Sequence, residues 1–221
     1  MTRNIILLSG GLDSATCAYI AKEAGDEIYA LSFDYGQRHT RELDAARAVA
    51  AAVRATEHLV MRFDLRLWGG SALTSDMAVP MDRDDTAMAA DIPVTYVPGR
   101  NTIFLAFAMS YAEAKGASKI YLGINALDYS GYPDCRPEYL AAFQEVARLG
   151  TKVGTEGHTV ELVAPLMHWD KAGIIKAGLA VGTNYALTWS CYQGGDTPCG
   201  RCDSCLLRAK GFAEAGLPDP A

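Results

Sequence analysis

The sequence predicts an α/β domain built on a doubly wound, mostly parallel sheet, and three observations favour this fold class. Short apolar runs bounded by polar residues or glycine alternate with longer amphipathic stretches, as strands alternate with helices in such a sheet. Half of the 221 residues are apolar, which is enough for one domain-sized core. No repeat, low-complexity tract or Ser/Gly linker divides the chain, so we expect a single domain over residues 1–221.

Four apolar runs are predicted to be buried parallel strands, at residues 4–8, 27–33, 57–61 and 119–123. Helical patterns fill the gaps, at residues 15–24, 41–55, 102–115 and 137–149, and the last of these begins with a proline in its first turn. Residues 69–99 show no clean period and are interpreted as a long functional loop. Doubly wound sheets bind ligands outside the carboxyl ends of their strands. Each junction between a strand and the next helix is therefore a candidate site.

Charge and composition narrow the class of partner. The net charge is −6 and no Lys/Arg cluster is present, which argues against nucleic acid or an anionic membrane and favours a small substrate. The apolar run near the N-terminus, residues 5–8, is too short for a secretion signal or a membrane span. We therefore expect a cytoplasmic protein, in which closely spaced cysteines indicate a metal or redox site rather than disulfides.

The first junction carries the sequence SGGLDS, residues 9–14, between the first strand and a helix. Adjacent glycines let the backbone approach a ligand closely, and amides at a helix N-terminus suit phosphate. The loop lacks the Walker Gly-Lys-Ser/Thr and the G-x-G-x-x-G spacing. The alternative interpretation is a plain tight turn in which Asp13 caps the helix.

Two further junctions offer polar side chains. After the second strand, Asp34, Gln37, Arg38 and His39 are candidates for the wall around a ribose and adenine, although solvent exposure is the favoured interpretation for His39. The sequence GRN at residues 99–101 places one arginine and one asparagine at a helix start. We expect Asn101 to be a structural N-cap, and we expect the planar guanidinium of Arg100 to contact a phosphate or a carboxylate.

The loop after the fourth strand is the candidate substrate pocket, because it carries more polar and aromatic side chains than a connection needs. Its candidates are Asp128, Tyr129, Tyr132, Asp134 and Arg136. Carboxylates can accept from N–H donors, a tyrosine can stack and an arginine can hold an anion. Capping by Asp134 and simple packing of the tyrosines remain the alternative.

Four cysteines follow the spacing C-x7-C-x2-C-x2-C, at Cys191, Cys199, Cys202 and Cys205. This spacing favours a tetrahedral zinc site over an iron–sulfur cluster, because the x3-Cys-Pro of the bacterial ferredoxin pattern is missing. Four protein ligands leave no open coordination position, so the zinc is expected to be structural. The other two cysteines, Cys17 and Cys135, are interpreted as packed side chains, although a nucleophilic Cys135 stays an alternative.

SGGLDS after a first strand resembles the pyrophosphate-loop motif of the ATP-pyrophosphatase superfamily, whose members cleave ATP between the α and β phosphates and adenylate an oxygen of the substrate. Four further stretches, FDYGQRH, VPGRNTIFL, GINALDYSGYPDCRPEY and LTWSCYQGGDTPCGRCDSCLLRAKGF, are together similar to the 7-cyano-7-deazaguanine synthase family. The resemblance covers most of the chain from the first strand to Phe212 and leaves out mainly residues 69–93. It implies a Rossmann-like fold of the adenine nucleotide alpha hydrolase type, with a nucleotide-binding core at 1–186 and a zinc-binding segment at 187–221.

The resemblance also implies the chemistry. The substrates would be 7-carboxy-7-deazaguanine, ammonia and ATP with Mg²⁺, and the product a nitrile, formed by adenylating first the carboxylate and then the amide. It implies catalytic roles for Asp13, Ser14 and Arg100, substrate binding by Asp128, Tyr129, Asp134 and Arg136, and zinc binding by the four cysteines. The ATP-binding residues would be Leu8, Ser9, Gly10, Gly11, Leu12, Asp13, Ser14, Ala15, Thr16, Cys17 and Ala18. A tRNA sulfurtransferase of the same superfamily and a non-catalytic zinc module are the alternatives, and a homodimer is left open.

Overall fold

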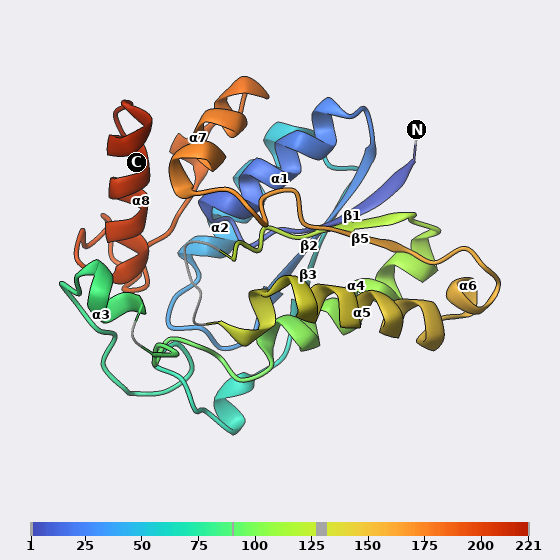
Figure 1. Ribbon diagram of the computed structural model, residues 1–221, viewed down its shortest axis with the longest axis horizontal. Coiled ribbons are helices and arrows are strands. Elements are labelled where there is room, and N and C mark those ends of the chain that lie inside the picture. Colours follow the sequence, from blue (N-terminus) through green and yellow to red (C-terminus); the bar gives the residue numbers. More distant parts are fainter. Residues whose placement is uncertain (1, 90, 127–131, 221) are drawn as a thin grey trace.

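A computed structural model describes residues 2–89, 91–126 and 132–220 (Figure 1). Its centre is a five-stranded parallel sheet in the order β3-β2-β1-β4-β5, which confirms the predicted fold class. The strands are β1 (Arg3–Leu7), β2 (Glu27–Asp34), β3 (Glu57–Arg62), β4 (Lys119–Tyr121) and β5 (Glu161–Val163). Because β1 pairs with both β2 and β4, the chain reverses its direction of winding between β1 and β4. A doubly wound sheet opens a crevice at this point.

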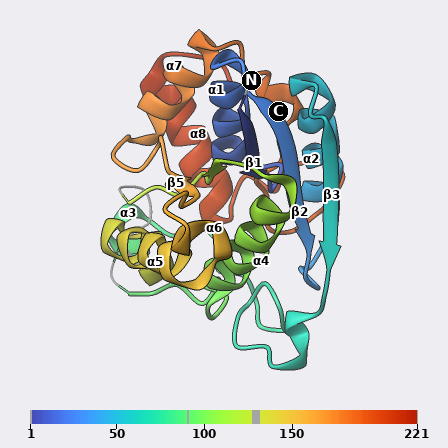
Figure 2. The same cartoon turned by 90° about the vertical axis from the view of Figure 1, so that its right-hand side faces the viewer.

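Helices cover both faces of the sheet (Figures 1 and 2). One face carries α1 (Leu12–Glu23) and α2 (Arg41–Val53), and the other carries α4 (Arg100–Lys115) and α5 (Pro137–Gly150). Two C-terminal helices, α7 (Lys171–Ala180) and α8 (Asp203–Ala215), pack against each other, and α7 packs on α1. The shorter elements are α3 (Asp85–Ala89), α6 (Lys152–Thr155) and the 3-10 turns Leu65–Leu67, Pro133–Cys135 and Tyr185–Leu187.

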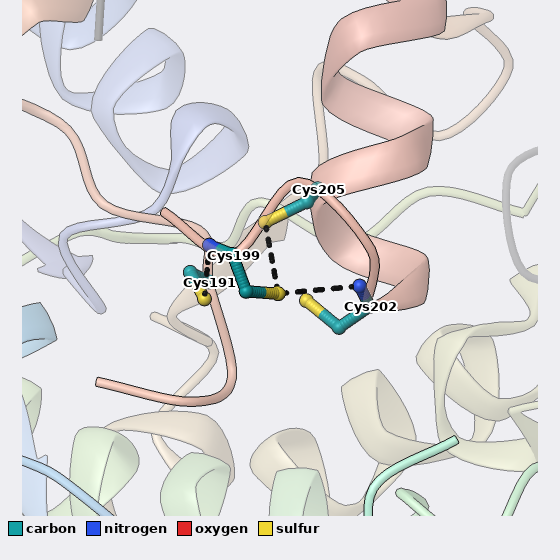
Figure 3. A group of neighbouring side chains, drawn as sticks. All are labelled: Cys191, Cys199, Cys202 and Cys205. Carbon is teal, nitrogen blue, oxygen red and sulfur yellow. Dashed lines mark hydrogen bonds between the residues drawn. The ribbon is translucent and has the colours of Figure 1, made fainter. Parts of the chain in front are cut away.

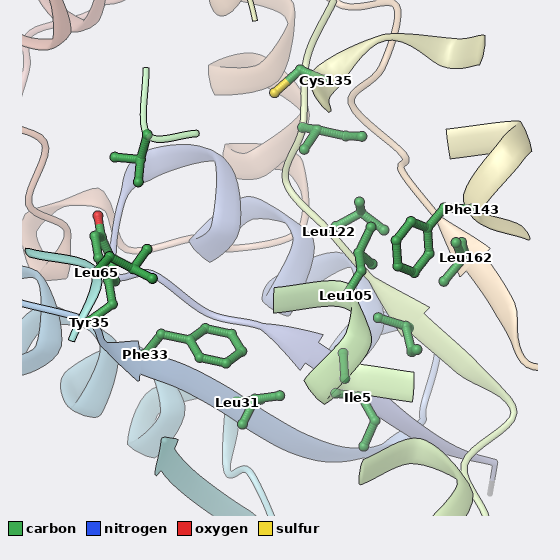
Figure 4. Close-up of a cluster of buried hydrophobic side chains, with 14 of the residues drawn as sticks. Ile5, Leu31, Phe33, Tyr35, Leu65, Leu105, Leu122, Cys135, Phe143 and Leu162 are labelled. Carbon is green, nitrogen blue, oxygen red and sulfur yellow. The ribbon is translucent and has the colours of Figure 1, made fainter. Parts of the chain in front are cut away.

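The two-residue period of the strands divides the core. Ile5 points to the cluster on the α4 side, whereas its neighbour Ile6 points to the cluster under α1 and α2. Both are fully buried, as parallel strands covered on two faces require. Figure 4 shows part of the α4-side cluster, including Phe33 of β2. The Phe33 ring also stacks on that of Phe104 in α4, with ring centroids 3.9 Å apart. The register is therefore fixed by burial on both faces.

Several predicted boundaries and one predicted cap differ from the structure. The helix α1 begins three residues earlier than expected, directly after the two glycines, and β5 and α7 were not predicted. Asn101 is not the N-cap of α4, because Gly99, with a φ of 63°, occupies that position. Instead, the Asn101 amide donates to Asp134 Oδ2 at 3.1 Å, so a neighbouring loop caps the helix from outside. The division into segments 1–186 and 187–221 stays a prediction.

The long loop at residues 69–99 is tied to the C-terminal part of the chain. The buried carboxylate of Asp203 pairs with Arg83, whose Nε lies 3.1 Å from Oδ1, and the Asp82 amide donates to the Arg201 carbonyl at 2.8 Å. Lys210 adds an ion pair to Asp85 at 2.6 Å. The loop thus belongs to the same packed unit as α8. Across the described ranges, every helix is too short or too polar to cross a bilayer.

Candidate functional site

A cavity of about 290 Å³ lies at the carboxyl ends of β1, β2 and β4, at the point where the winding reverses. It is lined by the loop between β1 and α1, by the first turns of α2, α4 and α7, and by the segment that precedes the cysteines. These elements come from nearly the whole length of the chain. The cavity is where the fold class predicts a ligand.

The loop at residues 9–14 presents free hydrogen-bond donors to this cavity. The N-cap of α1 is Gly11, which has no side chain to satisfy the first turn, and among the described residues the amides of Leu12, Asp13 and Ser14 have no hydrogen-bond partner. The loop itself is held by Ser9 and Ser14, whose hydroxyl oxygens are 3.0 Å apart. Unpaired amides at the positive end of a helix dipole form an anion site. This geometry supports the phosphate interpretation rather than the plain turn.

Asp13 does not cap α1 but forms an ion pair across the cavity. Both of its carboxylate oxygens lie 2.9 Å from Nζ of Lys171, in the first turn of α7. Both side chains are mostly buried, with 14% of Lys171 and 27% of Asp13 exposed. Lys171 was not predicted as a site residue, because β5 is only three residues long and the junction after it was not recognised. A cation is therefore fixed beside the three free amides.

Arg100 lies in the first turn of α4 and lines the cavity, as predicted. Its Nε is buried and has no hydrogen-bond partner, and its guanidinium carbon lies 5.8 Å from the ring centroid of Phe104. The groups that interact with it electrostatically are led by Tyr35 and Tyr132. A buried guanidinium with an unused donor is suited to hold an anionic ligand.

The predicted substrate loop is only partly open to description, because Asp128 and Tyr129 lie outside the described residues. Asp134 is buried and does not line the cavity, since it accepts the Asn101 amide. Arg136 is exposed, precedes α5 as its N-cap residue and also lies off the cavity. Tyr132 lines the cavity and its hydroxyl lies 3.0 Å from the Thr95 hydroxyl. Substrate binding by Asp128, Tyr129, Asp134 and Arg136 stays a prediction.

The junction after β2 contributes less than the sequence indicated. Gln37 is the only one of its four candidates that lines the cavity, with its amide group bonded to the backbone of Phe33 and Tyr35. Asp34 faces Arg62 at 3.8 Å, and Arg38 donates to carbonyls of the long loop. His39 is not in solvent: its ring lies 6.4 Å from that of Trp189, its Nδ1 is buried, and burial lowers its pKa.

Four of the predicted nucleotide residues lie away from the cavity, inside the first turns of α1. Ala15, Cys17 and Ala18 are packed in the core, and burial raises the pKa of Cys17 well above its usual value. Thr16 is fully buried and its hydroxyl pairs with the Tyr185 hydroxyl at 2.8 Å. Gly10 does not line the cavity either, whereas Leu8, Ser9, Gly11, Leu12, Asp13 and Ser14 do.

Cys135 lines the cavity but is a poor nucleophile. Burial raises its pKa to about 11, so it carries a proton near neutrality, and its sulfur accepts a hydrogen bond from Asn101 Nδ2 at 3.4 Å. The packed interpretation of this cysteine is therefore supported.

The four C-terminal cysteines come together, and their sulfur atoms all lie within 4.8 Å of one another (Figure 3). The Cys199 and Cys205 sulfurs are 4.0 Å apart, close to the separation of about 3.8 Å that bonds of about 2.3 Å to a tetrahedral zinc would give. Backbone amides point at these sulfurs, such as Cys199 N at 3.3 Å from Cys191 Sγ. Hydrogen bonds, led by that from Cys205, lower the pKa of Cys202 to about 5. The donor set is that of a four-thiolate metal site.

The residues on either side of the first cysteine of the cluster, Cys191, also form part of the cavity wall. The Trp189 amide donates to the Gly10 carbonyl at 2.9 Å, and its indole nitrogen donates to the Cys191 carbonyl at 2.8 Å. Trp189, Ser190 and Tyr192 line the cavity. One tryptophan therefore links the first loop of the chain to the first cysteine of the cluster.

Gly123, which follows β4, allows the backbone of the phosphate-type loop, residues 9–14, to pack closely against it. A Cβ atom there would lie 2.8 Å from the Ser14 nitrogen and 2.9 Å from the Asp13 carbonyl carbon. Both are backbone atoms, so Gly123→Ala must displace the free amides. Overpacking of about 1–3 kcal/mol predicts a loss of ATP affinity of about tenfold or more, measured by titration calorimetry. Gly150→Ala, where the nearest heavy atom is 4.0 Å away, should leave affinity unchanged; equal affinity in both variants would contradict the prediction.

Comparisons with known proteins show the family to which the chain belongs. The model of the family described as "Queuosine biosynthesis protein QueC" matches residues 3–216. The chain is 58% identical over 217 residues to a 7-cyano-7-deazaguanine synthase of Trichodesmium erythraeum, covering 98% of each chain. It is 58% identical over 218 residues to one of Kineococcus radiotolerans, covering 98% of this chain and 95% of the relative.

Solved structures share the fold at low identity. NMN synthetase from Francisella tularensis superposes with a TM-score of 0.52 at 14% identity, covering 98% of this chain and 78% of that one. A 4-thiouridine synthetase in complex with RNA and ATP gives 0.52 at 20% identity, covering 96% and 53%. The family assignment therefore rests on the family model and on the full-length relatives: the chain belongs to the QueC family of queuosine biosynthesis proteins.

Proposed function

We propose that the chain is an ATP-dependent carbon–nitrogen ligase that converts 7-carboxy-7-deazaguanine and ammonia into 7-cyano-7-deazaguanine. The observation that carries the proposal is the match of nearly the whole chain to relatives that bear the name of this synthase. The cavity supports it, because free amides, a buried arginine and a paired lysine suit a reaction that moves phosphate. A tRNA sulfurtransferase is not favoured.

The proposed roles follow from charge and position. The amides of Leu12, Asp13 and Ser14 hold the departing pyrophosphate of an ATP that enters as its magnesium complex, and the Asp13 carboxylate holds the Lys171 ammonium beside them. Arg100 holds the α-phosphate or the substrate carboxylate. These groups act mainly by positioning and by stabilising negative charge, which is the larger part of catalysis in transfers of this kind.

The same site serves two rounds of adenylation. A carboxylate oxygen attacks the α-phosphorus and releases pyrophosphate; ammonia then attacks the acyl carbon, and the bond to AMP breaks to leave an amide and a proton. In the second round the amide oxygen attacks another ATP, and loss of AMP with two protons in all gives the nitrile. Adenylation is needed each time because neither oxygen leaves readily as hydroxide.

The remaining partners follow from the same proposal. The cysteines hold a structural zinc, which closes the C-terminal segment and takes no part in the reaction, because four thiolates leave no position for water. The substrate is a free base in the cytoplasm rather than a nucleic acid, in keeping with the net charge of −6. Homodimer formation is left open.

Product analysis tests the proposal. With ATP, magnesium, ammonium and 7-carboxy-7-deazaguanine, mass spectrometry should detect the amide and then the nitrile, with AMP and pyrophosphate formed in each round. Synthetic 7-amido-7-deazaguanine should give the nitrile with ATP and no ammonia. Heavy oxygen in both carboxyl positions should appear in AMP. An inert amide, or label in water or pyrophosphate, would contradict double adenylation; stoichiometric ADP and orthophosphate would contradict the interpretation of the loop.

A further inference from the structure

Glu42 brings an unpaired carboxylate to the cavity. It lies in the first turn of α2 and lines the cavity, and no described residue donates a hydrogen bond to it or forms an ion pair with it. The turn that carries it packs directly on the phosphate-type loop, since a Cβ atom on Gly10 would lie 2.1 Å from the Glu42 carbonyl oxygen. Glu42 therefore lies in the wall of the cavity next to the loop at residues 9–14.

Among the charged groups that line the cavity, Glu42 is the carboxylate available to bind a cation. Only one other carboxylate of the described residues lines it, that of Asp13, and Lys171 already contacts both oxygens of that group. Arg100 and Tyr35 are the groups that interact electrostatically with Glu42. The titratable groups that share the cavity with it are Asp13, Tyr35, Arg100, Tyr132, Cys135, Lys171, Tyr192 and Arg208. Glu42 is half-buried, and a carboxylate partly removed from water is stabilised by a ligand that supplies the missing positive charge.

The proposed reaction brings such a ligand. Ammonium ions are weak acids, as the lysine pKa of about 10.4 illustrates, so nearly all ammonia near pH 7 is present as the ammonium ion. The ion cannot attack an acyl carbon until it loses a proton. A site that uses free ammonium therefore needs a negative group that both attracts the ion and takes its proton.

We propose that Glu42 binds the ammonium ion and accepts one of its protons, which frees ammonia to attack the adenylated carboxyl carbon. The inference rests on the proposed function and assigns one further catalytic residue to it. The carboxylate gains one proton, the new C–N bond forms, and the C–O bond to AMP breaks with its electron pair. The proton lost by the attacking nitrogen goes to water, and Glu42 returns its own proton to water before the next turnover.

The environment of Glu42 suits this role. Burial raises its pKa to about 7, while Arg100 opposes that rise, so the group is a stronger base than an ordinary carboxylate yet is still substantially ionised near neutrality. Only the ionised form can receive the ion. At low ammonium concentration, the rate of amide formation should therefore rise as the pH increases through about 7.

The two rounds of the reaction provide the test, because only the first consumes ammonia. In Glu42→Gln, amide formation from the carboxylate should fall by about 10²-fold or more at pH 7, and the levelling-off above pH 7 that the titration of Glu42 produces should disappear. Its residual rate should follow free ammonia and so increase about tenfold per pH unit over the neutral range. Conversion of the synthetic amide to nitrile should stay within about threefold of the wild type, since it uses the same ATP and base sites.

Controls keep the outcomes distinct. Asp44→Asn removes an exposed carboxylate of the same helix that pairs with Arg47 at 2.7 Å, and it should change neither round. Glu42→Asp should recover part of the first round, and melting curves check folding. An equal fall in both rounds would overturn the role of Glu42 in ammonium binding and leave the proposed function standing. A wild-type protein that forms neither amide nor nitrile would overturn the proposed function itself.

Discussion

Asp13→Ala is expected to lower the formation of AMP and pyrophosphate by about 10³-fold. The substitution removes the loop's carboxylate and both of its 2.9 Å contacts to the mostly buried ammonium of Lys171. Loss of one positioned group at a charge-transferring site costs about 10²–10³-fold, and a misplaced cation beside the phosphates adds to that loss. The measurement is steady-state release of pyrophosphate together with ATP titration.

A double-mutant cycle tests whether Asp13 and Lys171 contribute to activity as one unit. Lys171→Met should also be strongly impaired, and the double variant should be no worse than the more impaired single variant, because the two side chains act as one unit. Ser14→Ala should impair turnover through the loop hydroxyl, which lies 3.0 Å from that of Ser9. Its matched control, Ser118→Ala, changes a serine directly before β4, at the end of the strands away from the cavity, whose hydroxyl donates to Asn4 Oδ1 at 3.3 Å. An Asp13→Ala protein that keeps a tenth of its activity would contradict the assignment.

Cys202→Ser is expected to destabilise the protein by at least about 4 kcal/mol, the size of effect typical of a lost metal site. For a chain of this length that corresponds to a fall of about 8–16 °C in Tm. Metal analysis should find about one zinc per wild-type chain and much less in the variant. The loss of stability should extend to the long loop, residues 69–99. Cys202 forms an isolated β-bridge with Met81 of that loop, and the neighbouring Asp203 forms an ion pair with Arg83.

A second cysteine variant provides the control. Cys135→Ser changes a buried cysteine outside the cluster and should retain the full zinc content. Stoichiometric iron with labile sulfide in the wild type would contradict the zinc assignment, as would a Cys202→Ser protein with unchanged Tm. Activity per folded molecule should fall only slightly, because a zinc held by four cysteines has no open position at which to activate water.

The sequence predicted those parts of the site in which chemistry and spacing are local. The glycine pair before α1 and the x2 steps among Cys199, Cys202 and Cys205 specify their geometry within a few residues, and the structure brings each group together. The pairing of Asp13 with Lys171 is different, because it depends on where α7 packs against α1. No local pattern contains that information.

The strand and the helix cap that were predicted wrongly also depend on information outside the local sequence. β5 has three residues, too few for a two-residue period to stand out, so the junction that leads to Lys171 was missed. Asn101 has the residue type of an N-cap, yet Gly99 starts the helix and Asp134 supplies the acceptor from another loop. Local propensity was overridden by a tertiary contact in that case.

The hydrogen bond from Trp189 to Gly10 has a consequence for the order in which the protein is made. The ribosome synthesises the loop at residues 9–14 early and Trp189 with the cysteines late. The early loop therefore lacks its contact with Trp189 until the later segment has been made. Contacts between such distant residues form slowly and late in folding. The cavity therefore stays incomplete until residue 189 and the cysteines that follow it have emerged and folded, because Trp189, Ser190 and Tyr192 form part of its wall.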